Sequence, residues 1–144
     1  MAITIRIEIV SAEAKIFSGS AELLVAMGEM GELGIASGHT PLLTTLKPGQ
    51  LRVIHNLQNP ENNEELFYVS GGMLEVQPHI ATVLADTVVR AADLDEAKAK
   101  EAKARALDKL AERKSEFDYA EATAELAAAI AQLQTIQRLR KKHK

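Results

Sequence analysis

The residues best suited to chemistry lie in one glycine- and proline-rich stretch, "GELGIASGHTPLLTTLKPG", at residues 31–49. It contains His39, with Ser37 two residues before it. An imidazole near a serine could act as a general base, but such catalysis also needs a positioned nucleophile and usually a carboxylate that orients the ring. No nucleophile-elbow pattern surrounds Ser37. We therefore interpret His39 as a loop histidine and predict no catalytic residue in the chain.

The sequence gives no support to a metal or phosphate site. The chain has no cysteine and no H-E-x-x-H or similar ligand spacing. The remaining histidines are isolated from one another: His55, His79 and His143. Gly28, Gly31 and Gly34 recur at every third position, which matches neither G-x-G-x-x-G nor a P-loop. We expect these glycines to supply turns with positive φ.

Charge is distributed unevenly along the chain. Residues 1–86 hold four Lys/Arg and ten Asp/Glu, a net charge of −6, whereas residues 87–144 hold thirteen and ten, a net charge of +3. The last seven residues, "RLRKKHK", carry five positive charges but no interleaved aromatic side chain to stack on bases. We predict a solvated helix end or a contact with an acidic protein surface, and no nucleic acid partner. One group of carboxylates is interpreted as the charged rim of an exposed turn: Glu61, Glu64 and Glu65.

Length and composition predict a protein with a real hydrophobic core. The 144 residues suffice for one domain, or for a small domain with an appendage. Hydrophobic residues make up 47 % but aromatics only 3 %, so the core must be aliphatic. No apolar run approaches the roughly 20 residues that span a bilayer, and the N-terminus lacks a secretory pattern. We expect a soluble protein of the cytoplasmic compartment, without direct membrane insertion.

The first half of the chain has the pattern of an antiparallel β-sandwich or barrel. In "AITIRIEIV", isoleucines at 3, 5, 7 and 9 alternate with polar residues, which is typical of a half-buried strand. Further short β-rich runs follow, separated by Gly, Pro and Asn turn signals. Among these signals is "SGG" at 70–72, which we interpret as a hairpin corner.

The last third predicts an α-helical hairpin. Residues 91–144 contain no Gly or Pro and are rich in strong helix formers. Capping-box spacing at Asp93 and at Asp118 predicts one helix over 94–113 and another from 119 onward. The second helix carries one apolar stripe: Leu126, Ile130, Leu133, Ile136 and Leu139. The first offers a thinner face: Leu94, Ala97, Ala104, Leu107 and Ala111.

An alanine-rich seam stabilises the hairpin only modestly, because each buried methylene contributes about 0.8 kcal/mol. Such a hairpin either stays docked or detaches as a switch. Two functions therefore remain open from the residues alone. The chain is an adaptor or regulator within a larger assembly, or a small-ligand-binding β-sandwich that dimerises through its helices.

The order of several motifs distinguishes these functions. "GELGI", "GHTPLLT", "LKPG", "VSGG", "LEVQP" and "VLADT" follow one another through the first half, and "RAADLDEA" opens the helical part. With these motifs in this order, nearly the whole chain closely resembles the epsilon-subunit family of the bacterial F-type ATP synthase. The resemblance implies a ten-stranded β-sandwich at residues 1–88 and a regulatory helical hairpin at 89–144.

The resemblance also implies a function. The family is noncatalytic and sits in the central stalk, where its sandwich binds the gamma subunit and rests on the c-subunit ring. It couples ion-driven rotation of the ring to ATP synthesis. Its hairpin can extend into the alpha/beta catalytic head and there inhibit ATP hydrolysis. We therefore expect a peripheral location at the cytoplasmic face of the bacterial inner membrane.

Individual residues take their expected roles from matching positions in the family. The "GELGI…GHxPLLT" loops face the ring, which gives Glu32, His39 and Thr44 as ring contacts. The basic end of the second helix becomes an inhibitory tail that enters the head: Arg138, Arg140, Lys141 and Lys142.

One family feature is incomplete in this chain. Some members bind ATP through an Asp-x-x-Arg-Ala segment on the first helix and arginines on the second. Here Asp95 is retained, but Lys98 stands at the arginine position, and the middle of the second helix has no arginine. Because lysine cannot make the bidentate contact of arginine with a phosphate, we treat Asp95 and Lys98 as a remnant and expect no cofactor.

Overall fold

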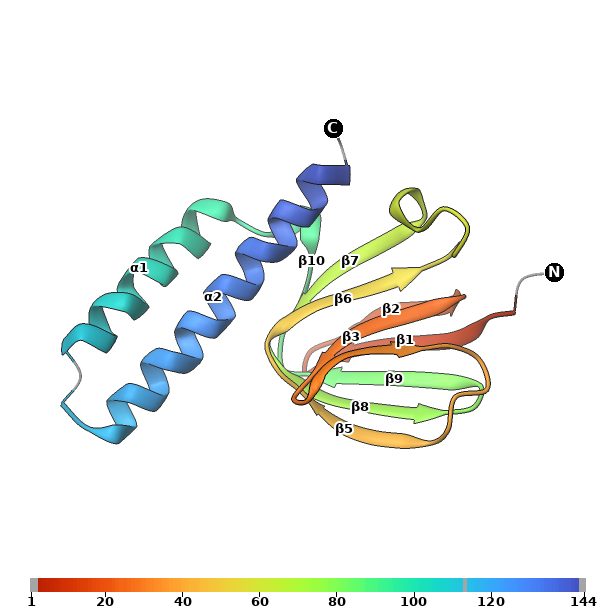
Figure 1. The fold of residues 1–144 in the computed structure, drawn as a ribbon, viewed down its shortest axis with the longest axis horizontal. Coiled ribbons are helices and arrows are strands. Elements are labelled where there is room, and N and C mark those ends of the chain that lie inside the picture. Colours follow the sequence, from red (N-terminus) through yellow and green to blue (C-terminus); the bar gives the residue numbers. More distant parts are fainter. Residues whose placement is uncertain (1–2, 113, 143–144) are drawn as a thin grey trace.

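The computed structural model describes residues 3–112 and 114–142 (Figure 1). Within them, ten strands precede two helices, α1 (Glu96–Glu112) and α2 (Glu116–Lys142). Two short 3₁₀ turns, η1 (Pro60–Asn62) and η2 (Ala91–Asp93), interrupt and end the β part. The strands are β1 (Ile5–Ser11), β2 (Lys15–Ala21), β3 (Leu23–Gly28), β4 (Gly31–Ile35), β5 (Leu42–Leu46), β6 (Gly49–Ile54), β7 (Glu64–Val69), β8 (Gly72–Gln77), β9 (Ile80–Ala85) and β10 (Val88–Arg90).

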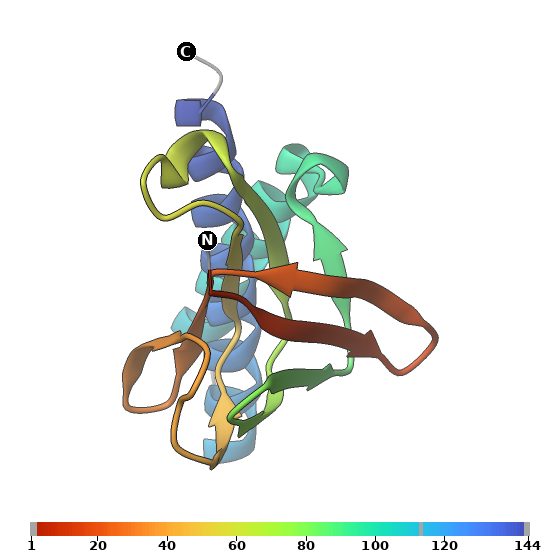
Figure 2. The ribbon, with the colours of Figure 1, turned by 90° about the vertical axis from the view of Figure 1, so that its right-hand side faces the viewer.

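The ten strands form a β-sandwich, as predicted. One layer has the order β10-β7-β6-β3, with β4 also paired to β3, and the other has the order β5-β8-β9-β1-β2 (Figures 1 and 2). A single residue pair, Gly28 with Leu46, joins β3 to β5 and so connects the layers. The pairing is antiparallel except between β1 and β9, which run parallel.

The core is aliphatic, in agreement with the composition. Ile5, Ile7 and Ile9 on β1 are fully buried, as their alternation predicts. Ile3 continues the same alternation but is 76 % exposed, because it precedes the strand. Phe67 on β7 is the largest fully buried side chain. The β half therefore has a core of its own, built from both layers.

Two glycine predictions have different outcomes. The "SGG" segment is a glycine-dependent corner, since Gly71 and Gly72 have φ of +111° and +145° and a Cβ on Gly72 would lie 2.1 Å from the Leu84 carbonyl oxygen. It does not close a hairpin, however, because β7 and β8 on either side of it belong to different layers and do not pair. Of the three regularly spaced glycines, Gly31 has positive φ, at +129°. For Gly28 and Gly34 the prediction is wrong, because both lie within paired strands β3 and β4.

The helices form the predicted hairpin, but they begin at other residues. The Asp95 carboxylate accepts the N–H of Lys98, 3.2 Å away, and so caps α1 in place of Asp93, which belongs to η2. The Ser115 hydroxyl accepts the N–H of Asp118 at 3.1 Å, so α2 begins three residues before the predicted Tyr119. The predicted end of the first helix, at residue 113, lies outside the described residues.

Alanines form the seam between the helices. Buried positions recur every seven residues on both: Ala99 and Ala106 on α1, and Ala122, Ala129 and Ile136 on α2. Small side chains let two helix backbones approach closely, which leaves the larger Leu107 outside and 48 % exposed. The predicted face of α1 is therefore wrong, since its alanines are exposed: Ala97, Ala104 and Ala111. On α2 the predicted stripe is at least half-buried throughout.

The second helix connects the hairpin to the sandwich. It packs against β6, β7 and η2, and α1 lies on its far side (Figure 1). Tyr68 on β7 is buried beneath it and hydrogen-bonds Gln132. Among the described residues, no helix is long and apolar enough to span a bilayer.

Candidate functional site

The loop that carries His39 is held in shape by its backbone. The Gly38 N–H donates to the Pro78 carbonyl oxygen at 2.8 Å, which ties this loop to the β8–β9 turn, and Gly38 has φ of +82°. The His39 Nδ1 lies 2.6 Å from the carbonyl oxygen of Thr40. This contact joins the imidazole to the backbone of the next residue and so holds the ring against its own loop.

The three predicted ring contacts are spread along the segment from β4 to β5. Glu32 is exposed and lies on β4 beside the β3–β4 turn, whereas His39 follows the other end of that strand. Thr44 is half-buried in the middle of β5, opposite Leu74 of β8. Within the described part of the chain, no hydrogen bond or ion pair joins these three side chains. The three residues are therefore spread along the chain rather than gathered in a compact cluster.

An apolar strip on the outside of the sandwich was not predicted from the sequence. Leu43 on β5, Met73 on β8 and Leu84 on β9 are 67 %, 37 % and 48 % exposed. Met73 and Leu84 are direct cross-strand partners, and Leu43 lies diagonally across from Met73. Neighbouring exposed apolar side chains of this kind mark an interaction surface. The period-two pattern of the strands could have found it, because these residues lie opposite the core positions.

The remnant of the nucleotide motif serves a structural purpose here. Asp95 caps α1 through the N–H of Lys98, as described above. The next residue, Glu96, forms ion pairs with Lys100 on the same helix and with Arg140 near the end of α2. The structure thus brings the start of the first helix together with the basic tail of the second.

The basic tail is bound to the sandwich through one buried carboxylate. The Glu64 side chain, at the start of β7, is 1 % exposed. Its Oε1 lies 3.3 Å from Arg138 Nε and 3.9 Å from Lys142 Nζ, and its Oε2 accepts from Arg52 Nε at 2.9 Å. Lys142 Nζ also donates to the Glu64 carbonyl oxygen at 2.9 Å. Three cations from two parts of the chain therefore surround one anion.

The prediction that Glu64 and Glu65 are rim residues of an exposed turn is wrong. Glu64 lies on the same face of β7 as Leu66 and Tyr68, and α2 packs against this strand and pairs with Glu64 through Arg138 and Lys142. A sequence signal for this existed, because β7 is apolar on both faces, which is typical of a covered strand. Glu61, in η1, is exposed as expected.

Glu65 belongs to a second polar cluster, which is partly exposed and made entirely of residues of the β part. Its carboxylate lies 2.7 Å from His55 Nε2 and 3.1 Å from Arg90 Nη1, and the Arg90 guanidinium lies 4.9 Å above the ring of Phe67. Burial alone would raise the pKa of Glu65, but hydrogen bonds from His55 and Arg90 lower it below its usual value. Because Arg90 also reaches the Ile16 carbonyl oxygen, this cluster bridges the edge strands β10 and β2.

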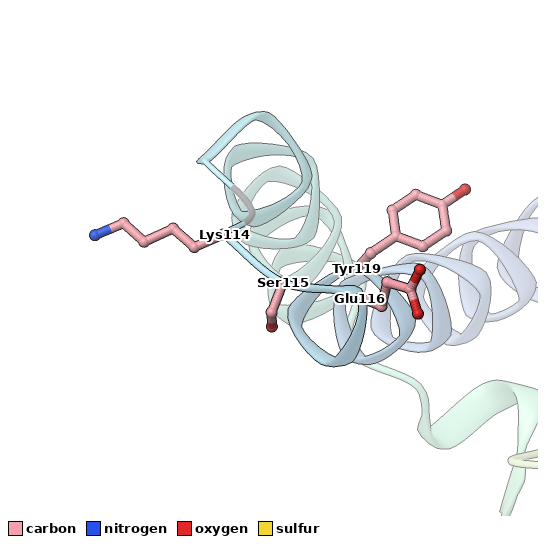
Figure 3. Close-up of a pocket in the computed structure, with 4 residues that line it drawn as sticks. All are labelled: Lys114, Ser115, Glu116 and Tyr119. Carbon is pink, nitrogen blue, oxygen red and sulfur yellow. The ribbon is translucent and has the colours of Figure 1, made fainter.

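The hairpin turn has a surface hollow lined by Lys114, Ser115, Glu116 and Tyr119 (Figure 3). The Lys114 side chain points away from the Glu116 carboxylate and the Tyr119 ring (Figure 3). The polar groups do not converge on a common point, as a ligand site would require. In residues 3–112 and 114–142, no group of three or more His, Asp or Glu side chains could hold a metal ion.

Comparison with known proteins gives consistent matches over the whole chain. The family model "ATP synthase, Delta/Epsilon chain, beta-sandwich domain" matches residues 4–91, and "ATP synthase, Delta/Epsilon chain, long alpha-helix domain" matches residues 92–137. The ATP synthase epsilon chain of Nitrosococcus oceani is 61 % identical over 142 residues, which cover 99 % of both chains. That of a Janthinobacterium species is 56 % identical over the same length and share.

Solved structures agree on the fold. A chain of the Euglena gracilis mitochondrial ATP synthase superposes with a TM-score of 0.69 at 18 % identity, over 98 % of this chain and 82 % of that one. A chain from the central stalk and c-ring structure of Tetrahymena thermophila ATP synthase gives 0.60 at 11 % identity, over 92 % and 96 %. With the family models and the two bacterial relatives, these matches show that the chain belongs to the Delta/Epsilon chain family of ATP synthases.

Proposed function

We propose that this protein is the noncatalytic epsilon subunit of a rotary F-type ATP synthase. The observation that carries the proposal is the match to bacterial epsilon chains at 56–61 % identity over 99 % of the chain. It includes the sandwich and the hairpin together, so both parts of the family's role apply. The sandwich couples ion-driven rotation of the c-ring to ATP synthesis, and the hairpin inhibits ATP hydrolysis.

Separate surfaces are available for separate partners. The loops that carry Glu32 and His39, with Thr44, contact the c-ring. The apolar strip of Leu43, Met73 and Leu84 binds the gamma subunit, because an outer sheet face with adjacent apolar side chains suits a protein partner better than water. The hairpin, when extended, reaches the alpha/beta head. The protein thus lies at the cytoplasmic face of the bacterial inner membrane, as a peripheral part of the complex.

The proposal is tested by co-purification with the gamma subunit of the same ATP synthase. The tagged chain is expected to retain gamma as a stable complex. The double variant Met73→Glu and Leu84→Glu places two charges on the apolar strip and should abolish that complex while circular dichroism of the chain stays unchanged. A wild-type chain that purifies alone, for example as a dimer joined through its helices, would contradict the proposal.

A second variant separates the two surfaces of the sandwich. His39→Ala should leave gamma binding and the ATP hydrolysis of the isolated head unchanged, because the loop contacts only the ring. In the membrane-bound complex it should weaken coupling, measured as ATP-driven ion pumping per ATP hydrolysed. Loss of hydrolysis in the isolated head would instead favour a catalytic role for His39.

A further inference from the structure

The contacts of the basic tail give it a second function in addition to the proposed inhibitory one. Arg138 and Lys142 pair with Glu64, and Arg140 pairs with Glu96. Those cations are the groups that an extended hairpin would present to the catalytic head. A cation held by Glu64 cannot at the same time contact an acidic surface elsewhere. Docking and inhibition therefore compete for the same side chains.

We propose that Glu64 is an electrostatic latch that holds the hairpin on the sandwich and sets how often the hairpin is released. The inference rests on the proposed function only for the consequence of release, because the latch itself is a property of the isolated chain. Its physical basis is the burial of Glu64: an ionised carboxylate away from water is stable only while it is paired and hydrogen-bonded.

Release of the hairpin breaks some of the ion pairs of Glu64 and leaves another in place. When α2 leaves, Glu64 loses Arg138 and Lys142 together and keeps Arg52, which lies on the neighbouring strand β6. Neutralising Glu64 raises the free energy of the docked state, because Arg52, Arg138 and Lys142 would then face one another without an anion. The docked state is thereby destabilised, while the released state, in which the groups are separated and hydrated, changes little.

Two kinds of variant should therefore act in opposite directions on ATP hydrolysis. Glu64→Gln releases the hairpin and leaves every tail cation in place, so inhibition becomes stronger. Replacing Arg138, Arg140, Lys141 and Lys142 with Gln also frees the hairpin but removes the groups proposed to contact the head, so inhibition becomes weaker. A tail that acted only as a solvated helix end would give no such opposition.

Glu65→Gln is the matched control. Glu65 is the next residue of the same strand, and its substitution removes the same charge by the same change. Its partners, His55 and Arg90, lie within the sandwich, so this variant leaves the contact between tail and sandwich intact. A response shared by both variants would reflect net charge or sandwich stability rather than the latch.

The position of the hairpin can be measured directly in the full chain. Because the sequence has no cysteine, Gln58→Cys on the sandwich and Gln137→Cys on α2, both exposed, can carry a spin-label pair. Pulsed dipolar spectroscopy should show mostly the docked distance in the otherwise unchanged chain and in Glu65→Gln. In Glu64→Gln the ratio of released to docked molecules should rise about tenfold, equivalent to about 1.4 kcal/mol.

A double-mutant cycle tests the direct contact. Arg138→Gln alone should also raise the released fraction, and adding it to Glu64→Gln should give less than the product of the two effects, because both remove one interaction. An unchanged distance distribution in both Glu64→Gln and Arg138→Gln would overturn the latch, whatever happens to hydrolysis. If Glu64→Gln releases the hairpin but hydrolysis by the reconstituted complex stays the same, the latch stands and the regulatory part of the proposed function fails.

Discussion

The sandwich and the hairpin are held together by different kinds of side chain. The sandwich buries whole Ile, Leu, Val and Phe side chains contributed by both layers. The hairpin seam buries mainly alanines, and α2 contacts the sandwich over Tyr68 and through the ion pairs of Glu64. A large apolar side chain contributes about 1.5–3 kcal/mol on burial, an alanine methyl far less. The sandwich is thus a stable frame, and the hairpin a separable attachment.

The largest expected effect on stability comes from truncating a side chain in the core of the sandwich. Phe67→Ala removes the largest fully buried side chain and should lower the free energy of unfolding by about 3–5 kcal/mol. Chemical denaturation followed by circular dichroism measures it. A fragment of residues 1–91, which keeps β10 (Val88–Arg90) and η2, should fold without the hairpin and show the same loss. An unfolded fragment would show instead that the two parts form one cooperative unit.

The sequence predicted the sandwich better than it predicted the hairpin contacts, and the reason is physical. Side chains of a β-strand alternate between two faces, so an apolar residue at every second position identifies the inner face without ambiguity. The burial of Ile5, Ile7 and Ile9 therefore followed directly from their spacing. In an alanine-rich helix several faces have nearly equal apolarity. The true seam through Ala99 and Ala106 then depends on how closely the partner helix approaches, which no local pattern encodes.

The candidate sites also differ in how far the sequence could predict them. Glu32, His39 and Thr44 could be selected only through family resemblance, because each is an ordinary loop or strand residue by itself. Glu64 was misinterpreted, since its partners Arg138 and Lys142 are more than seventy residues away in the sequence. A buried ion pair between distant segments becomes visible only once the topology places β7 under the end of α2.

A smaller effect should follow from overpacking the seam. Ala106→Leu adds three carbons at a fully buried position between α1 and α2, and overpacking of this kind costs about 1–3 kcal/mol. The hairpin should open while the sandwich keeps its own unfolding transition. Limited proteolysis of the full chain measures this opening as a faster rate of cleavage within residues 96–142. The control is Leu107→Ala, at the adjacent exposed position, which should leave the cleavage rate of the hairpin unchanged.

The smallest expected effect is a titration at the contact between the two parts. Burial raises the pKa of Tyr68, and a hydrogen bond donated by the Gln132 amide to the phenol oxygen offsets only part of that rise. A raised phenol pKa means that the docked state favours the protonated form. The stabilisation of docking is therefore fully present below the pKa of an exposed tyrosine, about 10, and is lost as the pH rises through the higher pKa of the docked state.

The chain has two tyrosines, so Tyr119→Phe leaves Tyr68 as the single optical probe of phenolate formation. Its pKa should fall toward that of free tyrosine in the 1–91 fragment, where α2 no longer covers it. Glu64→Gln should give an intermediate value, because releasing the tail exposes Tyr68 for part of the time. If full chain and fragment titrate at the same pH, then α2 does not bury this hydroxyl, and the contact with Tyr68 does not help to hold the hairpin on the sandwich.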